Sequence, residues 1–462
     1  MRARYGLAGI LLIAGLAPRA AHASGDERVE AYMKAYAARM GAAHASVPSF
    51  SRQTGLACSA CHYQFLALNP FGRQFKLNGY TLSTLKPIKG TDGKNGSTSL
   101  SLSPIGLFSA MVQASYTKIK DGIEGVQNGD AAMPQQMSGF LAGAITPRIG
   151  VFAQFTYSGA DNAFGIDNID LRYAKSGQIG KSTSAVYGFT LHNNPTVQDL
   201  WNTTPAWGFP FAASDAAPTG LASTLIDGGL AQQVLGLGAY TMLADLVYGE
   251  VSLYRSAIQG KAAADAFAIS GVAPYWRLAL QKTWDGRALM VGAFGLHTKK
   301  YPGPITGAAD KFTDLGFDAQ AEGKVGRGNL VFRGTFIREN QTLDGTKFLS
   351  GSANLKNTLN TAKVNASYYP SLKVGLTAGL FSTTGSTDAV LYPEEPVSGS
   401  ATGSPNTGGF IGEFDFNPWE NTRLGVQYTA YRKFNGLKTG YDGALRNASG
   451  NNTVYLIAWV VF

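Results

Sequence analysis

Apolar and polar residues alternate with a period of two along most of this 462-residue chain, from about Thr98 onward. Between Asp314 and Glu322, leucine, phenylalanine and alanine occupy one face, while carboxylates, glutamine and glycine occupy the other. The segment from Arg423 to Ala430 repeats the alternation. This pattern predicts β-strands. It is typical of a water-filled membrane barrel with lipid outside, and equally of a soluble β-sandwich with its apolar face inside.

The lengths of the connections separate these two folds. The chain contains about sixteen candidate strands between Ser99 and Phe462, and an even number of strands is typical of outer-membrane barrels. Their connections alternate between short and long, which is typical of barrels with short turns at one end and long loops at the other. We therefore expect an all-β membrane protein, with an antiparallel outer-membrane β-barrel over residues 98–462. The short connections include Pro147-Arg148, Leu243–Asp245, Asp285-Gly286, Gly323–Gly328, Pro370-Ser371 and Pro418–Asn421, and the long ones include Lys120–Pro134, Asn194–Asp227, Gln341–Ala353, Gly385–Thr407 and Asn435–Gly450.

Two segments of the predicted barrel agree with the outer-membrane interpretation. The last strand, Asn452–Phe462, is amphipathic and ends on an aromatic residue, as the assembly signal of bacterial barrels does. The C-terminus and the segment before the barrel then both lie in the periplasm. The longest connection, Asn194–Asp227, is the third external loop, and it resembles in position and length the inward-folded third loop of general diffusion porins. A loop on the surface is the alternative.

The chain begins with the features of a bacterial secretory signal. Arg2 and Arg4 precede an apolar run and a small-x-small cleavage motif, so residues 1–23 are predicted to be a signal peptide. The apolar run is too short for a transmembrane helix. Residues Asp26–Ala45 have the spacing of an amphipathic helix, which predicts a small helical domain, residues 24–90, ahead of the barrel.

Composition changes this picture little. Charged residues make up 15% of the chain, and the formal net charge of +9 includes arginines that leave with the signal peptide. The remaining positive charge is spread along the chain, with no basic cluster among aromatic residues, so nucleic-acid binding is not expected. After the signal peptide, no apolar run reaches the length of a transmembrane helix.

The N-terminal domain carries a specific chemical motif. Cys58, Cys61 and His62 form C-x-x-C-H, and the chain has no other cysteine. Two thiols at this spacing reach the two vinyl groups of a porphyrin, and the following imidazole ligates its iron. The motif predicts one covalent haem c, with the cysteines as thioethers and His62 as the proximal iron ligand. The alternatives are a structural disulfide, a dithiol redox pair without its usual fold context, and half of a zinc site without a second cluster.

The sequence leaves the ligand on the opposite face of the iron open. His44 lies just upstream of the motif and is the first residue to test as the distal ligand. Met33 and Met40 are further candidates, although both also fit the apolar face of the predicted helix. A vacant or water-filled position is another alternative. The remaining candidates are His192, His297, Met133 and Met137.

The residues around the motif resemble a known family. The runs Val47–His62 and Pro70–Thr81 are similar to the signature of the fused cytochrome–porins, outer-membrane proteins that include the iron oxidases of iron-oxidising bacteria. Over the barrel the resemblance is architectural only. Ser46 and Ser51 stand where the family usually has alanine, and Leu66 stands where it has proline; none is a haem ligand. The resemblance implies a small monohaem cytochrome at or inside the periplasmic mouth of the barrel.

Several other side chains suit this interpretation. Arg52, Arg73 and Lys76 lie close to the motif and are suited to pairing with the haem propionates, or else are solvated or lumen-facing cations. An apolar shell around the ring is one determinant of its redox potential. That shell would consist of Phe50, Phe65, Phe71 and Phe75. We expect three carboxylates to line the pore as ordinary charged residues, or else to attract cations: Asp314, Asp318 and Glu322.

The resemblance implies a function in electron transfer. A single electron would pass from an external donor, first of all Fe(II), through the haem to a periplasmic carrier, either a soluble cytochrome c or a copper protein. With iron as donor the protein would be an Fe(II) oxidase. The alternative is a diffusion porin whose cytochrome domain is a plug or a redox sensor, or a conduit for another donor or acceptor. A homotrimer is common among barrels of this size and is expected here.

Overall fold

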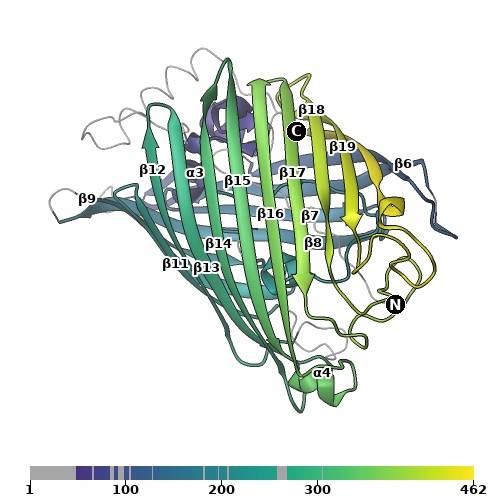
Figure 1. The fold of residues 1–462 in the computed structure, drawn as a ribbon. Coiled ribbons are helices and arrows are strands. Elements are labelled where there is room, and N and C mark those ends of the chain that lie inside the picture. Colours follow the sequence, from purple (N-terminus) through teal and green to yellow (C-terminus); the bar gives the residue numbers. More distant parts are fainter. Residues whose placement is uncertain are drawn as a thin grey trace.

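The chain forms a closed antiparallel barrel, as its alternating residues predict (Figure 1). In this computed structural model the described strands of the barrel are β5 to β20, so the predicted number of sixteen is confirmed. Each strand pairs with the next along the chain, and β20 pairs with β5 to close the ring. The structure describes residues 48–64, 67–83, 88–91, 98–102, 106–126, 128–180, 183–195, 197–204, 208–257, 268–303 and 305–462.

The wall of the barrel begins later than the alternation predicts. The first barrel strand starts at Phe108, because Thr98–Leu102 forms β4 and pairs with β3 (Ile88–Thr91) in a separate two-stranded sheet. The barrel strands are β5 (Phe108–Ile119), β6 (Asp130–Thr146), β7 (Ile149–Ser158), β8 (Ala163–Ile179), β9 (Thr183–His192), β10 (Val234–Leu243), β11 (Val247–Ser256), β12 (Ala273–Trp284), β13 (Arg287–Lys300), β14 (Asp310–Val325), β15 (Gly328–Thr342), β16 (Lys356–Ser371), β17 (Val374–Gly385), β18 (Thr407–Phe416), β19 (Thr422–Lys433) and β20 (Thr453–Val461).

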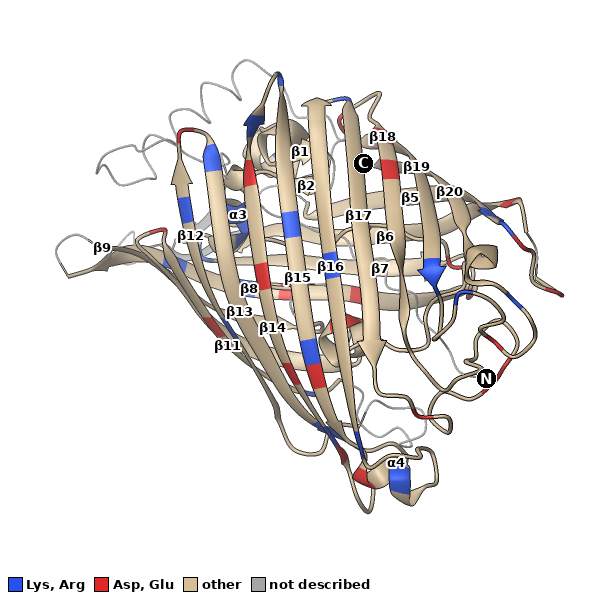
Figure 2. Cartoon of the chain, viewed as in Figure 1, with Lys and Arg blue, Asp and Glu red and all other residues tan. Residues whose placement is uncertain are grey.

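The outer face of the barrel is apolar and the inner face is polar. On β12, Leu278 and Leu280 point outward and are 58% and 52% exposed, whereas Arg277 points inward and is fully buried. On β14, Asp314 and Asp318 point inward in the same way. Long stretches of strand carry no charged residue (Figure 2). A soluble sandwich would bury the apolar face, so this exposed belt is the surface that meets lipid, and the predicted location in the bacterial outer membrane is confirmed.

Short turns join the strands at one end of the barrel, and long loops join most of them at the other. Asp285 and Gly286 form a two-residue turn with φ of 44° and 74°, left-handed values that match the twist of such hairpins. One predicted turn is wrong, because Pro370 and Ser371 belong to β16, where irregular pairing with β17 accommodates the proline. Leu372 and Lys373 make that turn instead. The short-turn end faces the periplasm.

The remaining elements are short and are not part of the barrel wall. Within the described residues, none of the helices is both long and apolar enough to cross a membrane. The predicted signal peptide and the predicted helix Asp26–Ala45 lie outside the described residues. Ahead of the barrel lie α2 (Ser49–Thr54), η1 (Cys58–Ala60), β1 (His62–Gln64), β2 (Ala67–Leu68) and α3 (Pro70–Leu77), and the long loops hold η3 (Leu225–Gly229), α4 (Asp344–Phe348) and η4 (Ala448–Asn451).

Two segments occupy the interior of the barrel. The plug, residues 48–83, lies at the short-turn end, and its helix α3 is visible within the ring of strands in Figure 1. The inward loop, residues 193–233, joins β9 to β10 and folds back among the lumen-facing side chains. The inward fold expected for the third external loop, residues 194–227, is therefore observed. Together these two segments position the candidate site.

Candidate functional site

The C-x-x-C-H motif forms a compact turn in the plug. Cys58 and Cys61 are at the start and just after the end of the 3-10 helix η1, and their thiols are not joined in a disulfide. Burial, with the charge of Glu420 adding to it, raises the pKa of Cys58 to about 11, and burial raises the pKa of Cys61 to about 12. Burial lowers the pKa of His62 to about 3, so its imidazole is neutral at ordinary pH.

These properties fit the donor set of a c-type haem. Two separate thiols on one turn meet the requirement for thioether attachment, and a neutral imidazole next to them is the form that ligates iron. The structural-disulfide alternative does not describe this structure, since both cysteines are free. Among the described residues, no group of three or more His, Cys, Asp and Glu side chains could hold a metal ion.

Two plug residues that the sequence analysis did not single out hold the motif against α3. Asn69 caps this helix by accepting from the Phe71 N–H at 3.0 Å, and its side-chain amide donates to Ser59 O and Ala60 O at 3.2 and 3.0 Å. Gly72 packs directly on the turn, because a Cβ at this position would lie 2.9 Å from the Cβ of Cys61. The Asn-Pro pair that opens α3 is a recognisable helix-start signal, whereas its contact with the motif is not visible in the sequence.

The motif is also attached to the barrel. Ser59 donates from its N–H and its hydroxyl to the two carboxylate oxygens of Glu420, both at 3.1 Å, in the turn between β18 and β19. In the same turn, Asn417 accepts a hydrogen bond of 2.7 Å from Gln64. The ring of Tyr63 stacks on Tyr369 of β16 with centroids 5.8 Å apart. The motif therefore lies at the periplasmic mouth, in the sector of β16 to β19.

The rest of the plug contacts the other sectors of the wall. The Ser49 N–H donates to Ser109 Oγ of β5 at 2.6 Å, and the Gln53 side chain bonds to the backbone of β6. Phe50 packs on Phe152 of β7 with centroids 6.4 Å apart. Further hydrogen bonds join Tyr80 to Asp170 of β8 and Leu77 to Tyr240 of β10. These contacts extend around the ring, so the plug spans the mouth rather than lining one side of it.

The three cations predicted near the haem have protein partners. Arg52 donates to the carbonyl oxygens of Gly106 and Phe108, at the start of β5. Arg73 forms a buried ion pair with Glu322 of β14. Lys76 is buried and donates to the carbonyl oxygens of Val197 and Asp199 in the inward loop, the latter at 3.1 Å. These contacts agree with the lumen-facing alternative, and pairing with propionates stays a prediction.

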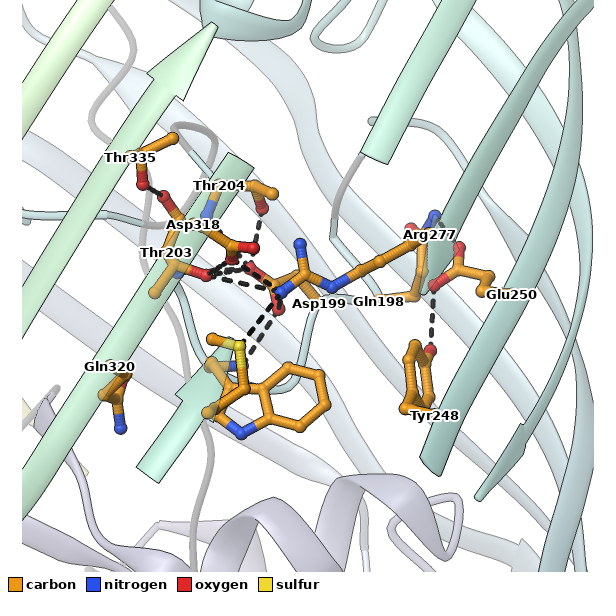
Figure 3. A network of polar contacts seen from close by, with 12 residues as sticks. Gln198, Asp199, Thr203, Thr204, Tyr248, Glu250, Arg277, Asp318, Gln320 and Thr335 are labelled. Atoms are coloured by element: carbon orange, nitrogen blue, oxygen red, sulfur yellow. Dashed lines mark hydrogen bonds and ion pairs between the residues drawn. The ribbon is translucent and has the colours of Figure 1, made fainter. Parts of the chain in front are cut away.

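Buried charges hold the inward loop. The guanidinium of Arg277, on β12, lies 2.6 Å from Asp318 of β14 and 3.5 Å from Asp199 of the loop (Figure 3). Asp199 thus links the loop to the wall and also organises the loop itself. Its carboxylate accepts backbone N–H groups of Trp201, Thr203 and Thr204.

The other predicted lumen-facing carboxylates have similar roles. Asp314 accepts the Ile226 N–H at 3.0 Å, and its neighbour Glu339 accepts the Leu225 N–H at 2.7 Å. Glu322 accepts hydrogen bonds from the guanidinium of Arg73 in the plug. The prediction that Asp314, Asp318 and Glu322 line the lumen is confirmed. They bind the plug and the loop rather than face an open channel.

The remaining candidate ligands are dispersed. His192, on β9, hydrogen-bonds Tyr254 OH at 2.8 Å and Thr190 at 3.1 Å, and His297, on β13, hydrogen-bonds Thr313 at 2.9 Å. Met133 and Met137, on β6, are 72% and 40% exposed. Of the predicted apolar shell, Phe50 and Phe75 pack edge to face with centroids 4.9 Å apart, and Phe71 lies in α3. His44, Met33, Met40 and Phe65 lie outside the described residues.

Several solved structures of outer-membrane proteins are similar to this chain at low sequence identity. No protein-family model matches the chain, and no curated protein sequence matches it. The outer-membrane channel DcaP of Acinetobacter baumannii is similar at 13% identity, over 81% of this chain and 100% of that chain, with a TM-score of 0.44. The anion-selective porin from Comamonas acidovorans is 11% identical over 77% of this chain and 98% of that chain, with a TM-score of 0.42. A trimer form of OmpT from Vibrio cholerae is 10% identical over 77% and 98%, with a TM-score of 0.41.

Proposed function

We propose that this chain is an outer-membrane electron-transfer protein of the fused cytochrome–porin type. It would carry one covalent haem c on Cys58 and Cys61, with His62 as the proximal ligand. The observation that carries the proposal is the C-x-x-C-H turn, built from free thiols and a neutral imidazole, within a plug at the periplasmic mouth of a membrane barrel. A haem there can exchange electrons with a periplasmic carrier while the donor stays on the other side of the membrane.

The residues of the chain would position and shield this group. Asn69 and Gly72 fix the motif turn against α3, and Glu420 fixes the same turn to the rim of the barrel. The apolar cluster around Phe75 would exclude water from the ring. When bound, the haem supplies a one-electron couple, and the protein supplies its position and potential. The proposed donor is Fe(II), and the proposed acceptor is a soluble periplasmic cytochrome c or copper protein.

A diffusion porin with a plugged mouth is the second candidate. Its support is the porin-type barrel itself, with polar side chains inside and an apolar belt outside. Against it stands the filled interior. Lumen-facing Arg172 and Arg277 are fully buried, because the plug and the inward loop cover them. We therefore expect the intact protein to conduct little.

One set of measurements tests both candidates. Purified protein in detergent is treated with Fe(II) and, separately, with dithionite, while the haem absorption is recorded. The electron-transfer proposal predicts a covalent haem that both reductants reduce, absent from the double variant Cys58→Ser, Cys61→Ser. Reduction by dithionite alone would exclude Fe(II) as the donor, and a protein without covalent haem would exclude the electron-transfer proposal. A large solute conductance of the intact protein in planar bilayers would favour the porin. Native electrophoresis tests the predicted homotrimer.

A further inference from the structure

Four basic residues lie on the outer surface of the barrel, at the external ends of neighbouring strands. Their side chains are exposed and alternate along each strand with less exposed ones, so they point away from the lumen. Basic residues mark the ends of these strands beside α4 in Figure 2. The basic patch consists of Lys299 on β13, Lys311 on β14, Arg338 on β15 and Lys356 on β16.

Strand pairing places the three lysines of the basic patch in one line across the sheet. Lys299 is directly opposite Lys311 in the β13–β14 pairing. On β15, Thr342 is opposite Lys311 on one side and opposite Lys356 on the other. Neighbouring strands are about 4.8 Å apart, so the line spans about 14 Å. Like charges opposite one another across strands are destabilising, and an anion bound to the outer surface would relieve their repulsion.

The basic patch begins where the apolar belt ends. Arg338 is directly opposite Leu315, which points outward and is 43% exposed. Two residues closer to the periplasm, Phe336 of the same strand also points outward and is 43% exposed. Lys311 is four residues from Leu315, about 13 Å along the strand and less along the membrane normal, because barrel strands are tilted. This places the patch at the depth of the lipid headgroups.

Carboxylates of the protein compensate only part of this charge. Asp344, in α4, lies 2.7 Å from the ammonium group of Lys311, and both side chains are partly exposed. Among the described residues, Lys299, Arg338 and Lys356 have no ion-pair partner. Four cations and one carboxylate leave the basic patch with a formal charge of +3.

The external ends of β9 and β10 have a different surface. Their outward side chains include Leu191 and Leu235, which are 39% and 49% exposed. Neither of these two strands carries a lysine or an arginine. The basic patch is therefore a feature of the β13–β16 sector rather than a uniform property of the rim.

We propose that the basic patch binds the phosphate groups of the phosphorylated glycolipid that forms the outer leaflet of the bacterial outer membrane. The acyl chains of this lipid would lie on the apolar belt beside Leu315 and Phe336. Its phosphates would lie on the line of lysines and on Arg338, where charge-assisted hydrogen bonds hold them. The inference does not depend on a haem, because every residue in it belongs to the barrel wall.

Native mass spectrometry of the purified full-length protein in detergent tests this proposal. The protein is titrated with bisphosphorylated lipid A and, separately, with dephosphorylated lipid A, and wild-type protein should bind the phosphorylated form at least tenfold more tightly. The triple variant Lys299→Gln, Arg338→Gln, Lys356→Gln should lose most of this preference, since each basic residue near an anionic surface contributes about fivefold. The matched control removes three exposed lysines from the short-turn end and should keep the preference: Lys282→Gln, Lys324→Gln, Lys373→Gln.

The outcomes distinguish a lipid from a free anion. Inorganic phosphate at the same concentration should not displace lipid A, because only the lipid also contacts the apolar belt; full displacement would overturn the proposal. Equal binding of the two lipids by wild-type protein, or equal weakening in the two triple variants, would overturn it as well. If the variant of the basic patch does not fold, the comparison of the two lipids on wild-type protein still decides.

Discussion

The plug and the inward loop fill the same barrel but are held by different forces. The plug packs mainly through an apolar cluster around Phe75 and through hydrogen bonds to strands in most sectors of the ring, with one buried ion pair, Arg73 with Glu322. The inward loop is anchored by buried charges, above all the contacts of Arg277 with Asp199 and Asp318. Apolar packing loses stability in proportion to the contacts removed, whereas removal of one partner of a buried ion pair leaves the other charge buried without compensation.

This difference suits the two proposed roles. A segment that carries a redox group needs a dry and rigid site, which apolar packing against several strands supplies. A loop that closes a lumen needs a defined position along the wall, which directional charge contacts supply. The two segments meet at Lys76 of the plug, which donates to carbonyl oxygens of the loop. Neither segment is therefore independent of the other.

Removal of the plug is expected to have the largest effect. Deletion of residues 48–83 takes away the segment that spans the periplasmic mouth, and sixteen-strand barrels otherwise leave an aqueous channel. We expect single-channel conductance in planar bilayers to rise from little to that of an open barrel. The variant Cys58→Ala, Cys61→Ala retains the plug and should stay closed. An equally low conductance after deletion would mean that the inward loop alone closes the lumen.

The second effect concerns the anchor of the inward loop. Arg277→Leu leaves Asp199 and Asp318 buried without their cation, which costs about 3–5 kcal/mol. We expect a lower urea midpoint of unfolding and noisy channel openings. Arg333→Leu is the matched control: this lumenal arginine hydrogen-bonds Gln320 at 2.9 Å and has no ion pair among the described contacts, so we expect a loss of about 1 kcal/mol. Equal losses in both variants would show that the loop is not held by charge.

The third effect concerns the contact of α3 with the motif. Gly72→Ala adds a Cβ that would lie 2.9 Å from the Cβ of Cys61, so either the helix or the turn has to move. Such overpacking costs about 1–3 kcal/mol. We expect a lower yield of covalent haem and faster proteolysis of the plug in folded barrels. In Gly106→Ala the added Cβ meets no atom within 4 Å, and haem yield should be unchanged. Normal haem yield in Gly72→Ala would argue against close packing.

The last effect is a pH dependence of plug docking. Burial, reinforced by the charge of Arg172, lowers the pKa of Lys76 from 10.5 to about 7. Below the pKa of the docked state, Lys76 is charged and buried, and the full cost of burying that charge opposes docking. This cost is relieved as the pH rises towards 10.5, the ordinary pKa of lysine, because the docked side chain loses its proton first. Protection of the plug from protease should therefore increase between about pH 7 and pH 10.5, the folded and the ordinary pKa of this side chain. Lys76→Met removes the titrating group, and a slope that persists in this variant would assign the dependence to another residue.

The barrel could be predicted from the sequence because its signals are local. Alternation around Asp314 and Asp318 assigns one face of each strand, and turn residues such as Asp285-Gly286 separate the strands. The start of the barrel was less predictable, since β4 has the composition of a barrel strand but pairs with β3. Pro370 marked a turn too early, because a proline at an irregular strand end carries the same sequence signal as a proline in a turn.

The candidate site was predictable only in part. The motif predicts its own chemistry, because Cys58, Cys61 and His62 are adjacent in sequence. Glu420 was not predictable, since it meets Ser59 across 361 positions of chain and only after the barrel has closed. The contact between Arg277 and Asp199 could not be predicted for a similar reason. Asp199 reaches it only because the third loop folds inward, and the sequence left open whether that loop would do so.

The pairing of β20 with β5 also governs the order of assembly. These strands are the last and the first of the wall, so the sheet keeps two open edges until the C-terminal residues have crossed into the periplasm. The plug precedes β5 and is available throughout that time. The plug can no longer leave sideways once β20 has paired with β5, where Val461 lies opposite Met111. The wall therefore encloses the plug only when β20 pairs with β5, and the last strand of the chain decides when the interior is sealed.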